Sequence, residues 1–137
     1  MAFVPLQYDS GMTKMMKIKD GEDVSKFDAL QFDSGEVKRA ESDTRTVRFI
    51  SLQDVSSADD EYILALDVRG VEFEADCDNN TDQDQVGLGQ SLQDHKEVAN
   101  DNTETDNEDA FVITQIVGKD SDQKVRGYFL DRTAGSN

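Results

Sequence analysis

The chain has 137 residues, of which 36% are apolar and 32% charged, and its formal net charge is −16 at pH 7. This length suffices for one domain with a single hydrophobic core. The negative charge excludes a nucleic-acid-binding surface, which requires clustered Lys or Arg, and no apolar run approaches the roughly 20 residues of a membrane helix. The first residues lack the basic and apolar regions of a secretory signal. We therefore expect a protein that is made in a cytoplasm and contacts neither nucleic acid nor membrane.

The N-terminal segment, residues 1–12, predicts an extended arm. It is mildly apolar, contains the only proline, Pro5, and reaches a turn at Asp9–Gly11. Proline cannot donate a ladder hydrogen bond, so the arm is expected at an edge and not inside a central sheet. Exposed apolar groups of this kind mark a partner surface. The apolar side chains that no turn folds back onto the domain are Phe3, Val4, Leu6 and Tyr8.

After the arm, short apolar runs alternate with turns every 8–12 residues, a pattern typical of a β-sandwich or a small β-barrel. Asp20-Gly21 and Asp33–Gly35 are turn sequences. The predicted strands of the first half are Met15–Ile18, Phe27–Phe32, Val37–Ala40 and Thr44–Ile50.

The second half continues this pattern but adds long acidic loops. Residues 1–50 contain eight Lys or Arg against nine Asp or Glu, whereas residues 51–110 contain two against eighteen. The polar loops are expected over 76–84 and 100–109. The predicted strands are Tyr62–Val68, Val71–Ala75, Phe111–Val117 and Val125–Leu130, with a brief return to the core at Val86–Leu92.

These patterns predict an all-β chain with no convincing helix. We expect residues 13–131 to form one β domain and residues 132–137 to form a loose tail. The core is expected to contain Phe49, Ile63, Leu64, Leu66, Phe73, Phe111, Ile113, Ile116 and Phe129.

The best ligand-like motif is the acidic run Asp76–Asp84. Its aspartates, spaced by two, resemble the start of a calcium-binding loop. Thr81 stands where such a loop requires glycine, and Gly87 stands where a bidentate glutamate closes the site. We expect no metal site here and a solvated loop instead, although a calcium or magnesium site elsewhere in the acidic loops stays open as an alternative.

The residues for enzymatic catalysis are scarce. His95 is the only histidine and lies in a polar run expected to be an exposed turn, so any base-activated nucleophile depends on it alone. Cys77 is the only cysteine, which excludes an internal disulfide, and its acidic neighbours disfavour a reactive thiolate. We expect no enzyme and no cofactor.

Several turn-bounded segments follow a recognisable order. Gly35–Ala40 fits the pattern G-x-V-x-x-A, and Gly70–Ala75 fits G-V-x-F-E-A. The other segments are Lys19–Val24, Phe27–Leu30, Val86-Gly87, Phe111–Ile113 and Val125–Phe129. This order resembles the head-decoration (cement) proteins of tailed bacteriophages, which are small β-barrels or β-tulips. The resemblance covers roughly Lys17 to Phe129.

The resemblance implies a β-barrel or β-tulip-like sandwich without catalytic residues that binds the outside of an assembled capsid and stabilises it. The expected partners are the major capsid protein and further copies of the chain, and the expected location is the capsid exterior of the virion. The alternatives are another virion component, such as a tail, neck or head-fibre base protein, and a cation- or carbohydrate-binding β-module. The candidate capsid contacts are Phe3, Val4, Leu6, Tyr8, Lys14 and Lys17.

Overall fold

The computed structural model describes residues 2–100 and 109–130, and within these ranges the chain is built from β-strands. Residues 101–108 and the predicted tail lie outside the described residues. Three single-turn 3₁₀ helices are the only helical elements in the described ranges: η1 (Ser10–Met12), η2 (Gln83–Gln85) and η3 (Asp120–Asp122). The all-β fold expected from the sequence is confirmed.

The first sheet has five strands in the order β2-β8-β6-β4-β5. All neighbouring pairs are antiparallel. Beyond the end of β2, Ile18 forms a parallel bridge with Val37 of β5, which brings the two outer strands of the sheet together at one end. The strands are β2 (Thr13–Lys17), β4 (Ala29–Asp33), β5 (Glu36–Arg39), β6 (Phe49–Ser51) and β8 (Tyr62–Asp67). A short two-stranded ladder joins β3 (Asp23–Val24) to β7 (Val55–Ser56).

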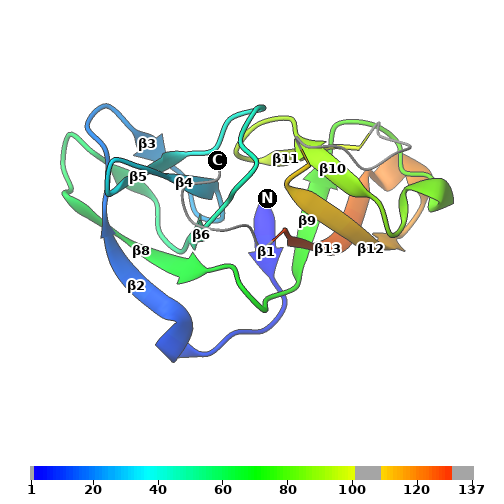
Figure 1. Cartoon of the computed structure of the whole chain (residues 1–137), viewed down its shortest axis with the longest axis horizontal. Helices are drawn as coiled ribbons and strands as arrows, with labels where there is room; N and C mark the ends of the chain where they lie inside the picture. The colour runs from blue at the N-terminus through cyan, green and yellow to red at the C-terminus, as the bar shows by residue number, and fades with distance from the viewer. Residues whose placement is uncertain (1, 101–108, 131–137) are drawn as a thin grey trace.

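The second sheet has six strands in the order β1-β9-β11-β10-β12-β13, and an additional β9–β13 pairing closes five of them into a ring. β1 and β11 share one edge of β9: β1 pairs with residues 73–75, and β11 pairs in parallel with residues 76–77. Figure 1 shows this ring on one side of the molecule and the five-stranded sheet on the other. The strands are β1 (Phe3–Pro5), β9 (Phe73–Cys77), β10 (Gly89–Leu92), β11 (Glu97–Ala99), β12 (Phe111–Val117) and β13 (Lys124–Phe129).

A large core runs between the two sheets. It contains Ile50 and Leu66 from the first sheet together with the phenylalanines of the second. Gly127 of β13 lies beside the ring of Phe111, and a Cβ at this position would come within 2.6 Å of that ring. A smaller, mainly aliphatic core that includes Phe49 lies on the other face of the five-stranded sheet, around Ile63.

The predicted core is largely confirmed, with two exceptions. Leu64 and Ile116 are only half-buried, whereas the other seven predicted residues are buried. In β8 the buried neighbours of Leu64 are Ile63 and Ala65, so Leu64 lies on the opposite side of the strand and is incompletely covered.

One predicted strand is mostly wrong. Of Thr44–Ile50, only the last two residues belong to a strand. Thr44 is buried, and its hydroxyl donates to the side-chain oxygen of Gln31 at 2.8 Å. The same hydroxyl accepts from the N–H of Glu41 at 2.9 Å, so Thr44 finds its partners locally and outside a strand ladder.

The prediction for the N-terminal arm is wrong at its start. Phe3 is fully buried, and β1 pairs antiparallel with β9. The Phe3 ring lies 5.0 Å from that of Phe129 and 5.8 Å from that of Phe111, measured between centroids. Buried aromatic surface outweighs the missing donor of Pro5, which lies at the end of the strand. Residues 2–5 therefore belong to the domain, and only residues 6–11 are exposed.

Candidate interaction surface

An exposed apolar surface lies where the segment after β1 meets the connection between β8 and β9. The backbone N–H of Leu6 donates to the carbonyl of Glu72 at 3.0 Å, which fixes the two segments side by side. Leu6 is 41% exposed, Tyr8 42% and Tyr128 45%. We call the surface formed by Leu6, Tyr8, Met12, Gly70 and Tyr128 the junction surface.

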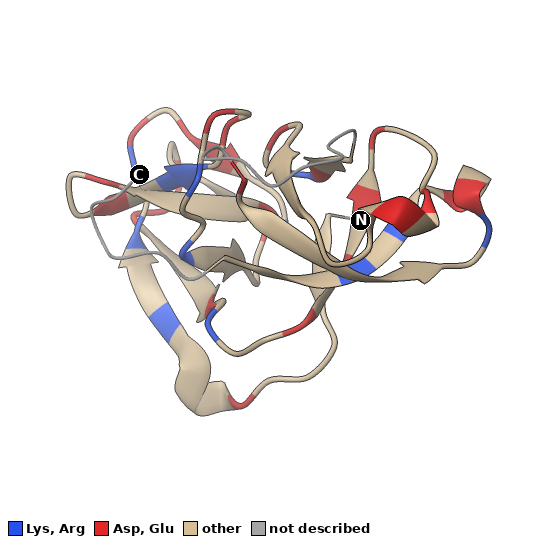
Figure 2. Ribbon diagram, turned by 45° about the vertical axis from the view of Figure 1, so that its right-hand side comes forward, with Lys and Arg blue, Asp and Glu red and all other residues tan. Residues whose placement is uncertain are grey.

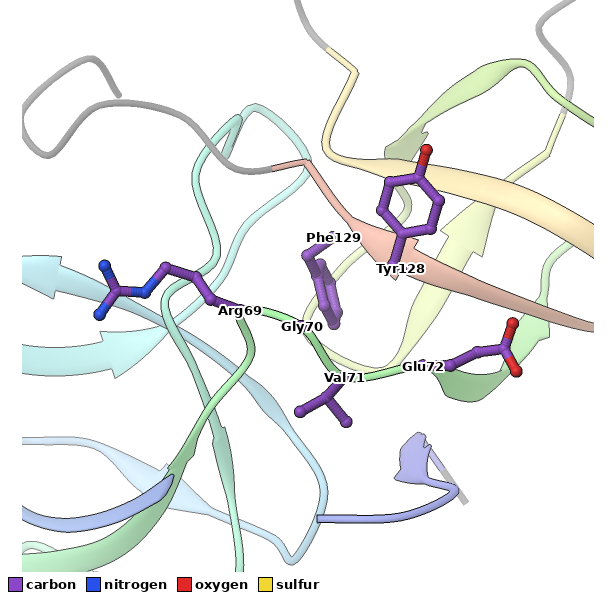
Figure 3. Close-up of a pocket in the computed structure, with 6 residues that line it drawn as sticks. All are labelled: Arg69, Gly70, Val71, Glu72, Tyr128 and Phe129. Atoms are coloured by element: carbon purple, nitrogen blue, oxygen red, sulfur yellow. The ribbon is translucent and has the colours of Figure 1, made fainter. Parts of the chain in front are cut away.

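Two shallow pockets flank Gly70–Glu72 in this surface. One, of about 330 Å³, is lined by this segment with Arg69, Tyr128 and Phe129. The other, of about 410 Å³, shares Gly70 and Glu72 and is lined on its other side by Leu6, Tyr8 and Met12 together with the polar residues Gln7 and Asp9. Figure 3 shows the Arg69 and Glu72 side chains pointing to opposite sides, so that charged groups border the first pocket.

A glycine turn and a local ion pair shape the backbone beneath the junction surface. Gly70 has φ of +77°, a conformation that side chains disfavour, and so provides the tight turn between β8 and β9. Asp67, at the end of β8, accepts two hydrogen bonds from the Arg69 guanidinium at 3.1 and 2.7 Å. Burial alone would raise the pKa of the Asp67 carboxyl, but the hydrogen bonds from Arg69 outweigh it and hold this pKa below its usual value.

The structure separates the six predicted contact residues into three groups. Phe3 is buried in the core and has no surface to offer a partner, whereas Val4 is half-buried in β1. Leu6 and Tyr8 lie together in the junction surface. The exposed side chains of Lys14 and Lys17 belong to β2 in the five-stranded sheet.

Sequence reasoning missed Tyr128 and Met12 as members of the junction surface. The alternation along β13 places Val125, Gly127 and Phe129 inside and thus Tyr128 outside, so the strand pattern contained the orientation of Tyr128. Its proximity to Leu6 depends on the pairing of β1 with β9, which no local pattern encodes.

The acidic run Asp76–Asp84 does not gather its carboxylates around one point. Asp76 belongs to β9 and accepts a hydrogen bond from Lys124 at 2.7 Å. The Asp82 side chain caps η2 by accepting from the N–H of Asp84 at 2.9 Å. In the described part of the chain, no group of three or more His, Cys, Asp or Glu residues is arranged to hold a metal ion.

The loop is instead fixed by a buried amide. The Asn100 side chain is fully buried, and its amide donates to the carbonyls of Asn79 and Asn80 at 3.1 and 3.2 Å. Its oxygen accepts from the N–H of Asn79 at 3.1 Å. These bonds connect the loop to the residue that follows β11, so the loop is packed against the domain at this point.

His95 occupies a different environment from the expected exposed turn. Its side chain is only 22% exposed, and its Nε2 lies 3.9 Å from Oδ2 of Asp28, a carboxylate that is 1% exposed. Lys96 donates to the other oxygen of Asp28 at 2.7 Å, and the N–H of Ala29 donates to the carbonyl of His95 at 2.8 Å. This cluster ties the connection between β10 and β11 to the start of β4 and so holds the two sheets together.

Cys77 is buried and chemically quiet. Burial raises the pKa of its thiol to about 12, and the charges of Asp78, Asp76 and Glu97 add to the shift. A thiol with such a pKa stays protonated at neutral pH and is a poor nucleophile. Cys77 therefore contributes to the larger core as a packed apolar side chain.

Comparisons with protein-family models, curated proteins and solved structures find no match to this chain. No helix in the described residues is long and apolar enough to cross a membrane.

Proposed function

We propose that the protein is a virion component that binds the outer surface of an assembled bacteriophage capsid and stabilises it. The observation that carries the binding role is the junction surface, in which three large side chains, Leu6, Tyr8 and Tyr128, are exposed beside the connection between β8 and β9. Tyrosines of this kind are frequent energetic centres of protein–protein interfaces. The resemblance of the segment order to head-decoration proteins supplies the class of partner.

The charge distribution supports this assignment. A capsid-exterior protein must remain soluble at high copy number and must not bind packaged DNA, and a net charge of −16 favours both. The major capsid protein is the proposed partner, and further copies of the chain are proposed neighbours on the capsid. Phe3 is buried, so Leu6 and Tyr8 are the proposed contacts of the N-terminal segment, joined by Tyr128.

The test is co-sedimentation of the purified full chain with capsids assembled from the major capsid protein of the same phage genome. We expect the native chain to sediment with the particles and to raise their melting temperature. The double variant Tyr8→Ala/Tyr128→Ala should bind at least tenfold more weakly, because hot-spot truncation costs about 2 kcal/mol or more.

The matched control is Phe32→Ala, which removes an aromatic side chain that is 40% exposed on the five-stranded sheet, away from the junction surface. It should bind capsids as the native chain does. Native binding by the double tyrosine variant would show that the junction surface is not the contact, and absence of any particle binding by the native chain would overturn the capsid assignment.

A further inference from the structure

Within residues 2–100 and 109–130, the strand β2 has an edge that no other strand covers along most of its length. It is the outermost strand of the five-stranded sheet, and among these residues its strand partner is β8. The bridge between Ile18 and Val37 begins after β2 has ended. Figure 1 shows β2 along the outer side of the molecule, with β8 on its inner side. An uncovered edge is a template for an added strand.

The register shows which backbone groups this edge presents. The backbone N–H and C=O of Leu64 point away from β2. Its carbonyl accepts a hydrogen bond from the N–H of Leu52, and its N–H donates to the side-chain oxygen of Gln53. Met15 lies opposite Leu64 in the antiparallel pair. Met15 and Leu64 therefore form a non-hydrogen-bonded pair of the antiparallel ladder, in which each residue directs its N–H and C=O away from the partner strand. The N–H and C=O of Met15 therefore point to the free edge.

The side chains on the same face are apolar and uncovered. Met15 is 58% exposed and Tyr62 is 50% exposed, while Leu64, the cross-strand partner of Met15, is half-buried. Cross-strand partners lie on one face of a sheet, so Met15 and Leu64 form a continuous apolar strip that ends at Tyr62. A strand added at the free edge would extend this strip.

The charge at this edge differs from the rest of the molecule. Lys14 and Lys17 are exposed, and among the described acids Lys17 makes a long contact of 3.8 Å with Glu36 on the surface. In Figure 2 the strand at the lower left, β2, carries blue segments and no red one. In a protein with a net charge of −16, this edge is a local site to which carboxylates are attracted.

We propose that the free edge of β2 accepts an extended acidic segment of a partner protein as an additional antiparallel strand. The register sets the sequence of that segment: an acid opposite Lys17, apolar residues opposite Met16 and Met15, and an acid opposite Lys14. This inference goes beyond the proposed function and does not depend on it.

A second copy of the chain fits this edge poorly. Two antiparallel β2 strands meeting at Met15 would place Lys14 and Lys17 of both copies along one short ladder. The like charges would then repel one another at close range. The lysines therefore select an acidic partner and oppose self-pairing.

The test uses the full chain labelled with nitrogen-15 and the synthetic peptide acetyl-TEVVET-amide as probe. We expect saturable shifts of the Met15 and Lys17 amide signals and an affinity that falls with added salt. The peptide acetyl-TKVVKT-amide should bind at least tenfold more weakly. The double variant Lys14→Glu/Lys17→Glu should reverse this preference.

Two further variants separate strand addition from simple charge attraction. Met15→Pro removes an N–H that points away from β8, so the fold should persist while binding of acetyl-TEVVET-amide is lost. Lys119→Glu makes the same charge change as either single substitution in the β2 double variant, but at an exposed position before η3. It should bind acetyl-TEVVET-amide as the native chain does. Unchanged Met15 and Lys17 signals at millimolar peptide, or equal binding of both peptides by the native chain, would overturn the proposal.

Discussion

The smaller core of the five-stranded sheet is mainly aliphatic, whereas the six-stranded sheet contributes four phenylalanine rings to the larger core. The smaller core contains Ile18, Leu30, Val37 and Ile63, all supplied by the sheet or its immediate connections. In the ring, Phe129 lies within 5.2 Å of three other rings, centroid to centroid, namely those of Phe3, Phe73 and Phe111. The aromatic cluster therefore depends on the N-terminal strand, and it shares its core with Ile50 and Leu66 of the five-stranded sheet.

The two sheets also differ in how they use their basic residues. In the ring, Lys124 and Arg126 lie next to Asp76 and Glu74, so the strand charges are largely compensated. In β2 of the five-stranded sheet, two lysines remain exposed. The basic side chains of both sheets are thus partly exposed, and Lys14 and Lys17 differ in lying on one edge strand that contains no acid.

The largest expected effect separates β1 from the segment that follows it. Phe3→Ala should lower the free energy of unfolding by about 3–5 kcal/mol, because it removes a fully buried ring from the aromatic cluster. Leu6→Ala should change it by no more than about 0.5 kcal/mol, because that side chain is exposed. Urea unfolding measures both. Equal small effects would mean that β1 does not contribute to the core.

The second effect tests the aliphatic core of the five-stranded sheet. Ile63→Ala should cost about 2–5 kcal/mol of unfolding free energy, because Ile63 is fully buried. Leu64→Ala, on the opposite side of the same strand, should cost about 1 kcal/mol, because Leu64 is half-buried. Thermal unfolding of the two variants gives the ranking. A larger loss for Leu64→Ala would reverse the assigned orientation of β8.

The third effect compares an ion pair that joins the two sheets with one on the surface. Lys96→Met leaves the buried carboxylate of Asp28 without its hydrogen bond of 2.7 Å, and should cost about 1–3 kcal/mol. Lys17→Met removes an exposed contact of 3.8 Å and should cost less than about 0.5 kcal/mol. Denaturant midpoints at neutral pH distinguish the two, and equal costs would contradict the role of Asp28 as a buried anchor.

The sequence predicted the longer strands well because their alternation is local. β12 coincides with the predicted Phe111–Val117, and β4, β5, β8 and β13 lie within or overlap their predicted runs. The shortest strands escaped prediction, because two or three residues show no period. β11 is an example, in which Val98 is the only buried residue of a polar run.

The candidate site was less predictable than the fold. Leu6 and Tyr8 were found from their apolar character, but the burial of Phe3 depends on pairing with Ala75, about seventy residues away. The position of His95 likewise depends on contact with Asp28 across the two sheets. Register between distant segments is not written in any local window of the chain.

The smallest expected effect comes from one acid in each sheet. Glu97 of β11 is partly desolvated and lies near Asp94, Asp78 and Asp76, which raises the pKa of its carboxyl. A raised pKa means that the folded state favours the protonated form, so the stability associated with Glu97 is full below its unfolded pKa of about 4.3 and declines as the pH rises. At pH 7 the ionised carboxylate is therefore unfavourable.

Glu97→Gln should accordingly raise the melting temperature slightly at pH 7 and leave it unchanged near pH 3, where the native residue is already protonated. The gain at pH 7 should shrink with added salt, because salt screens the repulsion among these partly exposed acids. The matched variant Glu36→Gln, in the five-stranded sheet, removes a contact of 3.8 Å with Lys17 and should produce no gain. Thermal unfolding at the two pH values measures all four cases. A higher melting temperature for Glu36→Gln at pH 7, or a lower one for Glu97→Gln, would contradict this prediction. Either result would show that the charge around Glu97 is not more unfavourable than the charge around Glu36.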